Sequence, residues 1–260
     1  MSDNITALLE RNFDRYARNA QLKPGLLIVA PAVVALIAFI PDGFNASKWL
    51  GGLIVTIGGT FALAHIARAA GRKLEPLLYE SWGGMPSAAW LRHRDTRIDE
   101  HTKRRYHQFL QSKIKDWVPP TPESEAQDST KADALYVSAS RWLREYTRDT
   151  KKYPRVADEN ISYGFRRNSL GSRGYGFGIS VATLVFSGAV AAYVLLQGHK
   201  VSALEVMSPF LSAGLLWYWV IIVKADWVRD AAEAYARALV AACEVTTPPR
   251  AKRAAKPKPA

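Results

Sequence analysis

Four uncharged apolar segments constrain the fold of this chain more than any other feature. They span 24–40, 49–67, 174–196 and 206–223, and each has 17 to 23 residues. At about 1.5 Å per helical residue, such segments approach or match a hydrocarbon core of roughly 30 Å. The alternative is a set of buried helices in a soluble protein, but those usually keep a polar stripe. The sequence therefore predicts an all-α membrane protein with four transmembrane helices.

Basic residues divide unevenly between the loops that join these segments. The loops at 41–48 and 197–205 hold only Lys48 and Lys200 of the 35 Lys and Arg residues. Basic loops stay on the cytoplasmic side of a membrane. We therefore expect a multi-pass membrane protein, in contact with lipid, whose two termini both face the cytoplasm.

The segments divide the chain into six parts. The central part is predicted to be a helical cytoplasmic domain inserted between spans 2 and 3, and the tail is rich in Pro and predicted to be disordered. That tail either contacts anionic lipid or stays solvated. In order, the parts are an amphipathic cytoplasmic helix (1–23), a transmembrane hairpin (24–71), the basic domain (72–173), a second hairpin (174–223), a helix that continues span 4 without a break (224–245) and the basic tail (246–260).

The central domain is strongly basic and reads as helical. It carries 20 Lys and Arg against 14 Asp and Glu, a net charge of +6. Apolar spacing predicts one helix over 101–114 and a second that starts at Ser129 and ends at Pro154. A Pro-rich loop at 119–123 links the two.

Motifs for catalysis, cofactors and metals are missing. The single cysteine, Cys243, excludes an intrachain disulfide and a zinc site built on cysteines. The sequence contains no phosphate-binding GxxxxGK[ST], no GxSxG and no HExxH. We expect no enzyme, no cofactor and no metal site. His65, near the end of the second segment, is a candidate pore-lining or titrating residue, or else a side chain that reaches the membrane interface.

Clusters of arginine supply the candidate binding residues. The spacing of Arg141, Arg144 and Arg148 predicts one stripe on a helix, with Trp142 and Tyr146 beside it. Arginines next to aromatic rings suit phosphates and stacked bases. The competing interpretation is a solvated helix face over a buried Trp142. The full set of candidate residues for an anionic ligand is Arg92, Arg94, Arg104, Arg105, Arg141, Arg144 and Arg148.

Small residues in the segments predict close helix packing. We expect a homo-oligomer held through the spans and the helix at 225–244. Hydroxyl side chains in the segments either join helices or face water in a pore. The glycines are Gly51, Gly52, Gly58, Gly59, Gly174, Gly176, Gly178 and Gly188, and the hydroxyl residues are Thr56, Thr60, Ser180, Thr183 and Ser187.

Three short motifs carry a resemblance to known proteins. They are RKLEP at 72–76, WGGMP at 82–86 and LRHRD at 91–95. With the span arrangement, they resemble a set of uncharacterised bacterial four-span inner-membrane proteins. Such proteins are similar to membrane effectors of nucleotide-signalled anti-phage defence, of the Hailong type. The resemblance implies a nucleotidyltransferase partner whose DNA oligomers gate the effector, and it carries over no individual ligand residue.

Two function classes follow as expectations. The first is an oligomeric effector or channel that permeabilises the membrane under control of an anionic cytoplasmic ligand, a nucleotide or oligonucleotide, or of a partner. The second is a non-conducting structural or scaffolding membrane protein that recruits a cytoplasmic partner.

Overall fold

The computed structural model describes residues 15–39 and 46–245, with the side chains of 46–57 left out of the description. This part of the chain is helical and contains no strand, so the all-α prediction is confirmed for it. The expected helix over 1–23 lies mostly, and the expected tail wholly, outside the described residues. The elements are η1 (Ala17–Leu22), α2 (Lys23–Ala38), α3 (Ala46–Ser81), α4 (Pro86–Ala89), α5 (Glu100–Lys113), α6 (Pro122–Gln127), α7 (Ser129–Tyr146), α8 (Pro154–Gly171), α9 (Arg173–Leu196), α10 (Ala203–Trp217), η2 (Tyr218–Ile222), α11 (Ala225–Ala241) and η3 (Ala242–Glu244).

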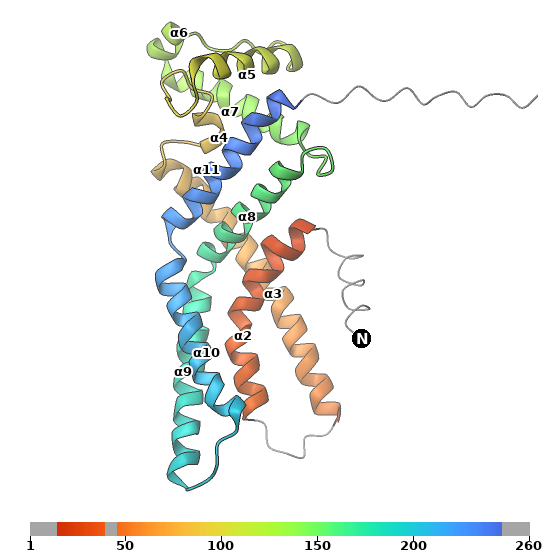
Figure 1. Ribbon diagram of the computed structural model, residues 1–260, viewed down its shortest axis with the longest axis vertical. Helices are drawn as coiled ribbons and strands as arrows, with labels where there is room; N and C mark the ends of the chain where they lie inside the picture. Colours follow the sequence, from red (N-terminus) through yellow and green to blue (C-terminus); the bar gives the residue numbers. More distant parts are fainter. Residues whose placement is uncertain (1–14, 40–45, 246–260) are drawn as a thin grey trace, which may run out of the picture.

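The molecule is an elongated column with a span region at one end and a globular helical region at the other (Figure 1). Three stretches of the described residues are long and apolar enough to cross a membrane: Ala17–Ala38, Arg173–Leu196 and Ala203–Ile222. They coincide with three of the four predicted segments. The remaining segment, 49–67, lies within α3, where the side chains of 46–57 are not described.

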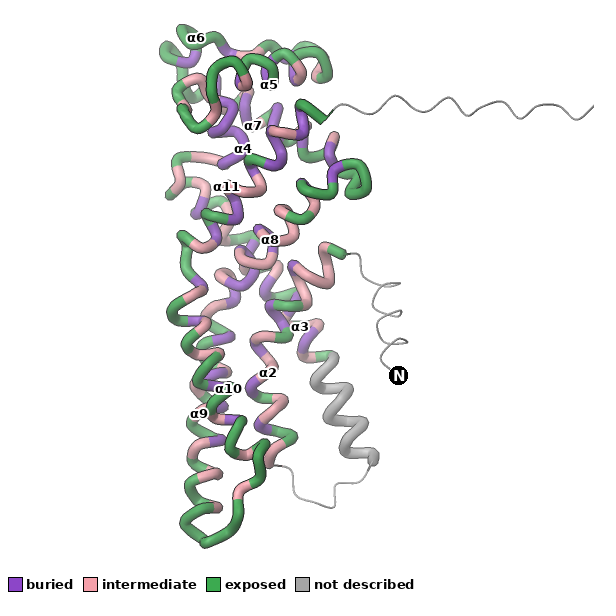
Figure 2. Tube along the Cα trace, in the orientation of Figure 1, coloured by how far each residue is buried: buried purple, intermediate pink, exposed green. Residues whose placement is uncertain are grey.

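The span helices expose many apolar side chains that a soluble domain would bury. Figure 2 shows that buried residues gather in the globular region, whereas the span helices are mostly exposed or half-buried. The fully buried side chains there include Ile28 and Trp219, and also the hydroxyls of Ser180, Ser187, Ser208 and Ser212, each 0% exposed. Ser187 Oγ donates to the carbonyl of Thr183 at 2.7 Å. These hydroxyls lie between helices, and the outward faces are left apolar, as lipid favours.

The predicted fourth span does not continue without a break into the helix that follows it, as the sequence suggested. Val223 and Lys224 adopt non-helical conformations, with ψ of 87° and 164°, and separate η2 from α11. Arg173 of α9 satisfies carbonyls that the break leaves open, since its Nε donates to Trp219 O at 2.8 Å. The prediction of an unbroken rod is therefore wrong. The longer rods are α3, at about 54 Å for its 36 residues, and α8–α9, which only Ser172 separates.

The globular core combines the central domain with the C-terminal helix. Leu239 and Val240 of α11 pack in one cluster with Leu91, Leu110 and Leu143. Residues 72–173 therefore share their core with α11 and do not close a core alone. The apolar face of α11 is used inside the chain, so the oligomer contact expected through this helix would need another face.

Pro154 begins a helix and does not end one. The helix that starts at Ser129 stops at Tyr146, eight residues before Pro154 in the sequence. Pro154 occupies the first turn of α8, where its missing N–H costs nothing. The helix predicted over 101–114 is confirmed as α5, capped by the Asp99 side chain that accepts from Thr102 N at 2.9 Å.

A backbone-to-backbone crossing of α3 and α8 positions the candidate site. A Cβ at Gly171 would collide with the backbone at Gly71, so both residues must be glycine for this approach. One turn from the crossing, Glu75 on α3 faces Arg167 on α8. Among the described glycines singled out from the sequence, Gly176 makes such a contact, against the ring of Trp219. The others of that set have open space where a side chain would lie: Gly58, Gly59, Gly174, Gly178 and Gly188.

Candidate anion-binding cleft

A basic cleft lies where the globular region meets the helices that lead into the spans. A small cavity of about 30 Å³ opens between α7, α8 and α11. It shares Tyr79, Arg144, Tyr163 and Tyr235 with a larger hollow that reaches Arg15, ahead of η1. We call the two together the cleft. Its charged lining residues are Arg15, Arg72, Arg141, Arg144, Arg148, Arg167, Glu75 and Glu145.

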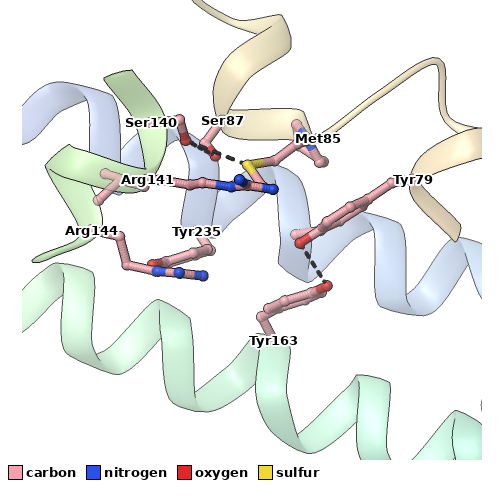
Figure 3. A pocket seen from close by; sticks show the side chains of 11 residues that line it. Tyr79, Met85, Ser87, Ser140, Arg141, Arg144, Tyr163 and Tyr235 are labelled. Atoms are coloured by element: carbon pink, nitrogen blue, oxygen red, sulfur yellow. Dashed lines mark hydrogen bonds between the residues drawn. The ribbon is translucent and has the colours of Figure 1, made fainter. Parts of the chain in front are cut away.

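Helix α7 supplies two of the predicted arginines to the cleft. Its apolar face buries Tyr136, Ala139 and Leu143, which turns Arg141 and Arg144 to the opposite side. Figure 3 shows both arginine side chains extending from α7 into the cavity. In the described part of the chain, neither of them forms an ion pair with a carboxylate.

The third predicted member of this stripe lies beyond the helix. Arg148 follows Thr147, the C-cap of α7, so the three arginines do not share one helix. Its guanidinium is 3.8 Å from the Glu145 carboxylate, with the Arg148 side chain 86% exposed. It lines the outer part of the cleft.

A hydrogen-bonded cluster around Glu75 forms the floor. One oxygen, Glu75 Oε1, accepts from Tyr163 Oη at 2.7 Å, Arg167 Nη1 at 2.8 Å and Tyr79 Oη at 3.1 Å. Burial alone would raise the pKa of Glu75, but the charge of Arg167 and these hydrogen bonds lower it below its ordinary value. Glu75 is therefore an anion that already occupies part of a cationic site.

The tyrosines of the cleft stay neutral, and Tyr79 and Tyr163 donate hydrogen bonds to Glu75. Burial and the negative charge of Glu75 raise the pKa of Tyr79, and burial, the neighbouring Tyr79 phenol and Glu75 together raise the pKa of Tyr163. Burial also raises the pKa of Tyr235 to about 12. The rings of Tyr163 and Tyr235 lie nearly parallel, at 3° and 6.2 Å between centroids.

Three other predicted arginines, Arg92, Arg94 and Arg105, are neutralised in ion pairs away from the cleft. Arg92 binds Asp133 through two nitrogens, at 2.8 and 2.9 Å. Arg94 binds Asp133 at 2.7 Å and Glu125 at 2.8 Å. We call these four residues, with Tyr136, the distal network. Arg105 pairs separately with Glu244 at 2.7 Å.

Glu125 is the most constrained carboxylate of the distal network. It is 3% exposed and accepts from Tyr136 Oη at 2.7 Å and from His93 N at 2.8 Å. Burial would raise its pKa, but the hydrogen bonds from Tyr136, His93 and Arg94 outweigh burial and lower the pKa to about 2. Arg92 and Arg94, which belong to the distal network, therefore stabilise the fold.

Two further predicted residues lie elsewhere. Arg104 is exposed on α5 and lines a separate hollow with Lys103 and Pro120. His65 is exposed on α3 beside Ile66, whose side of the helix is also open. It therefore faces outward from the described bundle.

The sequence did not reveal most of the cleft. Arg72, Glu75, Tyr79, Tyr163 and Arg167 come from two helices, and the Tyr163–Glu75 bond joins residues 88 positions apart. In the sequence, Arg167 stands out only as one of two adjacent basic residues, Arg166 and Arg167, close to a predicted span. The predicted aromatic partners, Trp142 and Tyr146, stack on each other at 4.8 Å and pack against the core.

The chemistry of the cleft suits a phosphate-bearing anion. Guanidinium forks match phosphate oxygens and stay charged, and neutral phenols donate hydrogen bonds beside them. Comparison of the chain with protein-family models, with curated protein sequences and with solved structures found no match. Function is therefore inferred from the cleft and its connection to the span helices.

Proposed function

We propose that this protein is an oligomeric inner-membrane effector or channel that permeabilises the membrane under control of an anionic cytoplasmic ligand. The observation that carries the proposal is that α3 and α8 line the cleft and also lead toward the spans. Helix α3 contains the predicted second span, and α8 joins α9 through Ser172 alone. A ligand bound at the cleft acts directly on these two helices.

The membrane arrangement proposed with this function has four spans and both termini in the cytoplasm. Its support is the uneven distribution of basic residues and the three span-length helices among the described residues. The contacts between copies form through the lipid-facing side chains of the spans, which include Phe186, Phe210 and Trp217, each more than half exposed.

The proposed ligand is a nucleotide or oligonucleotide made by a nucleotidyltransferase partner in anti-phage defence. The partner and the defence role rest on the family resemblance, and the chemical class rests on the cleft. Unpaired arginines repel one another, so a polyanion stabilises the arrangement in which they lie close together. A ligand shifts an equilibrium when it binds one arrangement more tightly. Binding between α7 and the α3–α8 pair therefore biases how these helices pack.

Flux measurements on liposomes that contain the full chain test the proposal. Single-stranded DNA trinucleotides of each base are the probes, and release of a trapped ion indicator is the readout. We expect at least one probe to trigger release, and Arg144→Ala to abolish the response. Arg104→Ala is the matched control, since it removes an exposed arginine outside the cleft. Release that is equal for both variants and the wild type would exclude the cleft as the control site.

A non-conducting scaffold is the second candidate, and one observation favours it. The span hydroxyls are buried between helices of a single copy, so the outward span faces offer apolar side chains to a neighbouring copy. A pore between copies would need polar groups on those faces. Ligand binding without any flux would support the scaffold over the channel.

A further inference from the structure

The deepest cation of the cleft is only partly neutralised. Arg167 is 8% exposed, and its Nη1 donates to Glu75 Oε1 at 2.8 Å. Its Nε is buried and has no hydrogen-bond partner among the described residues. Buried donors are nearly always paired, and an exception indicates an incomplete site. Its Nη2 donates to the amide oxygen of Asn168 at 3.3 Å, so Arg167 binds its carboxylate through one nitrogen only.

The same residues fasten three helices together. Glu75 and Tyr79 belong to α3, and Tyr163 and Arg167 belong to α8. Asn168, fully buried next to Arg167, donates from Nδ2 to the carbonyl of Ala20 in η1 at 2.7 Å. Each of these helices leads into an expected span, so the floor of the cleft is also a clamp on the spans.

We propose that Arg167 is the deepest phosphoryl subsite of the cleft and that Glu75 fills it in the absence of ligand. This inference rests on the proposed function, because it concerns the same cleft. A phosphoryl group offers separate oxygens to Nη1 and Nη2, whereas Glu75 gives one oxygen to Arg167, Tyr163 and Tyr79 together and leaves Nη2 to Asn168. Arg72 and Arg144 line the same hollow and attract the anion into it.

Replacement of Glu75 by a phosphoryl group at Arg167 changes the contact between α3 and α8. Once a phosphoryl group binds Arg167, Glu75 keeps only its two phenol donors, and the ion pair between α3 and α8 is lost. Glu75 is thus an internal competitor of the ligand, and its release is the step that loosens α3 from α8. The subsite thereby couples occupancy of the cleft to the packing of the predicted second and third spans.

Calorimetric titration of the full chain in detergent with inorganic tripolyphosphate tests the subsite. Glu75→Gln keeps an amide oxygen that can accept from both tyrosines but removes the competing charge. We expect it to bind tripolyphosphate about tenfold more tightly than the wild type. Glu145→Gln, the matched control, removes the same charge at the exposed outer edge of the cleft and changes affinity less than about twofold. Arg167→Lys, which cannot form the bidentate contact, binds more weakly than the wild type.

The outcomes separate this inference from the proposed function. Equal gains in Glu75→Gln and Glu145→Gln would overturn the subsite, because charge removal alone would explain both. If Arg144→Ala still weakened binding in that case, the proposed function would stand. Binding of tripolyphosphate that no cleft variant alters would overturn both. If Glu75→Gln does not fold, Tyr163→Phe decides, since it loosens Glu75 without changing charge: a gain of about threefold supports the subsite, and unchanged affinity overturns it.

Discussion

Two groups of arginines in the globular region look alike in the sequence and differ in what neutralises them. In the distal network, Arg92 and Arg94 are held by Asp133 and Glu125 at 2.7 to 2.9 Å. In the cleft, Arg141 and Arg144 have no such partner among the described residues. A basic cluster therefore signals a binding surface only where the fold brings no carboxylate to it.

The two groups of arginines also contribute differently to the free energy of unfolding. A buried carboxylate is stable only when every donor around it is in place, and removal of one member leaves the others buried and unpaired. Exposed and unpaired arginines contribute little to folding and are free to bind a ligand. We therefore expect mutations in the distal network to change stability, and mutations in the cleft to change binding.

The largest effect is expected for Glu125→Ala. This change removes the acceptor of Tyr136 Oη, His93 N and Arg94 Nη1, and leaves the Arg94 guanidinium with Asp133 alone. We expect a loss of about 3–5 kcal/mol in the free energy of unfolding, measured by denaturation in detergent. Glu123→Ala, on the exposed side of the same helix, is the control and should unfold like the wild type. A Glu125→Ala protein of normal stability would contradict the structural role of the distal network.

A second prediction concerns acid sensitivity near the distal network. Burial lowers the pKa of His107 from 6.5 to about 4, although Nε2 bonds the Leu91 carbonyl. Lys103, His93 and Glu125 also act on this imidazole, and the lysine and His93 disfavour its charge. Between pH 6.5 and 4 the unfolded chain binds a proton at this imidazole and the folded chain does not. The free energy of unfolding therefore decreases as the pH is lowered through that window.

The expected size of this effect is about 2 kcal/mol between pH 8 and pH 5. Denaturation midpoints at the two pH values provide the measurement. His107→Gln keeps a donor for Leu91 O and cannot titrate, so its stability should vary less over the same range. An equal pH dependence in both proteins would assign the effect to another group.

Much of the fold follows from the sequence, because apolar length and helical spacing are local signals. The segments at 174–196 and 206–223 match α9 and α10–η2 closely, and 101–114 matches α5. The break at Val223 was missed because no Pro or Gly marks it and the helical spacing of Trp227, Ala231 and Tyr235 continues beyond it. The helix that Pro154 starts was missed because proline ends or begins a helix depending on its neighbours.

The candidate site was less predictable, for a physical reason. Arg141 and Arg144 could be named from spacing, but which arginines keep their charge free depends on carboxylates brought from other helices. Arg94 meets Glu125 across 31 residues, and Arg167 meets Glu75 across 92. No local pattern reports such pairings. The close crossing at Gly71 and Gly171 that creates the floor is equally nonlocal.

A third prediction compares one variant from each group of arginines. Arg92→Ala should lower stability by about 1–2 kcal/mol, because Asp133 keeps only Arg94. It should leave tripolyphosphate binding unchanged. Arg144→Ala should do the reverse, with unaltered unfolding and binding weakened about tenfold, or about 1.4 kcal/mol. Paired calorimetry and denaturation on both variants measure this. Two variants with the same pattern of losses would remove the distinction between the groups.

The smallest effect is expected at the outer edge of the cleft. Arg148 has an 86% exposed side chain and lies 3.8 Å from Glu145, whose side chain is 65% exposed. Solvent screens such a pair, so Arg148→Ala should change the free energy of unfolding by less than about 0.5 kcal/mol. Its contribution to binding is long-range attraction, which salt screens within about 8–10 Å. We therefore expect Arg148→Ala to weaken tripolyphosphate binding about twofold at low salt, and not measurably at 0.5 M salt. Arg144→Ala should keep its loss at both salt concentrations, because contact inside the cavity is screened less. If the two variants lost affinity equally at high salt, Arg148 would belong to the contact surface, and the cleft would extend beyond the end of α7.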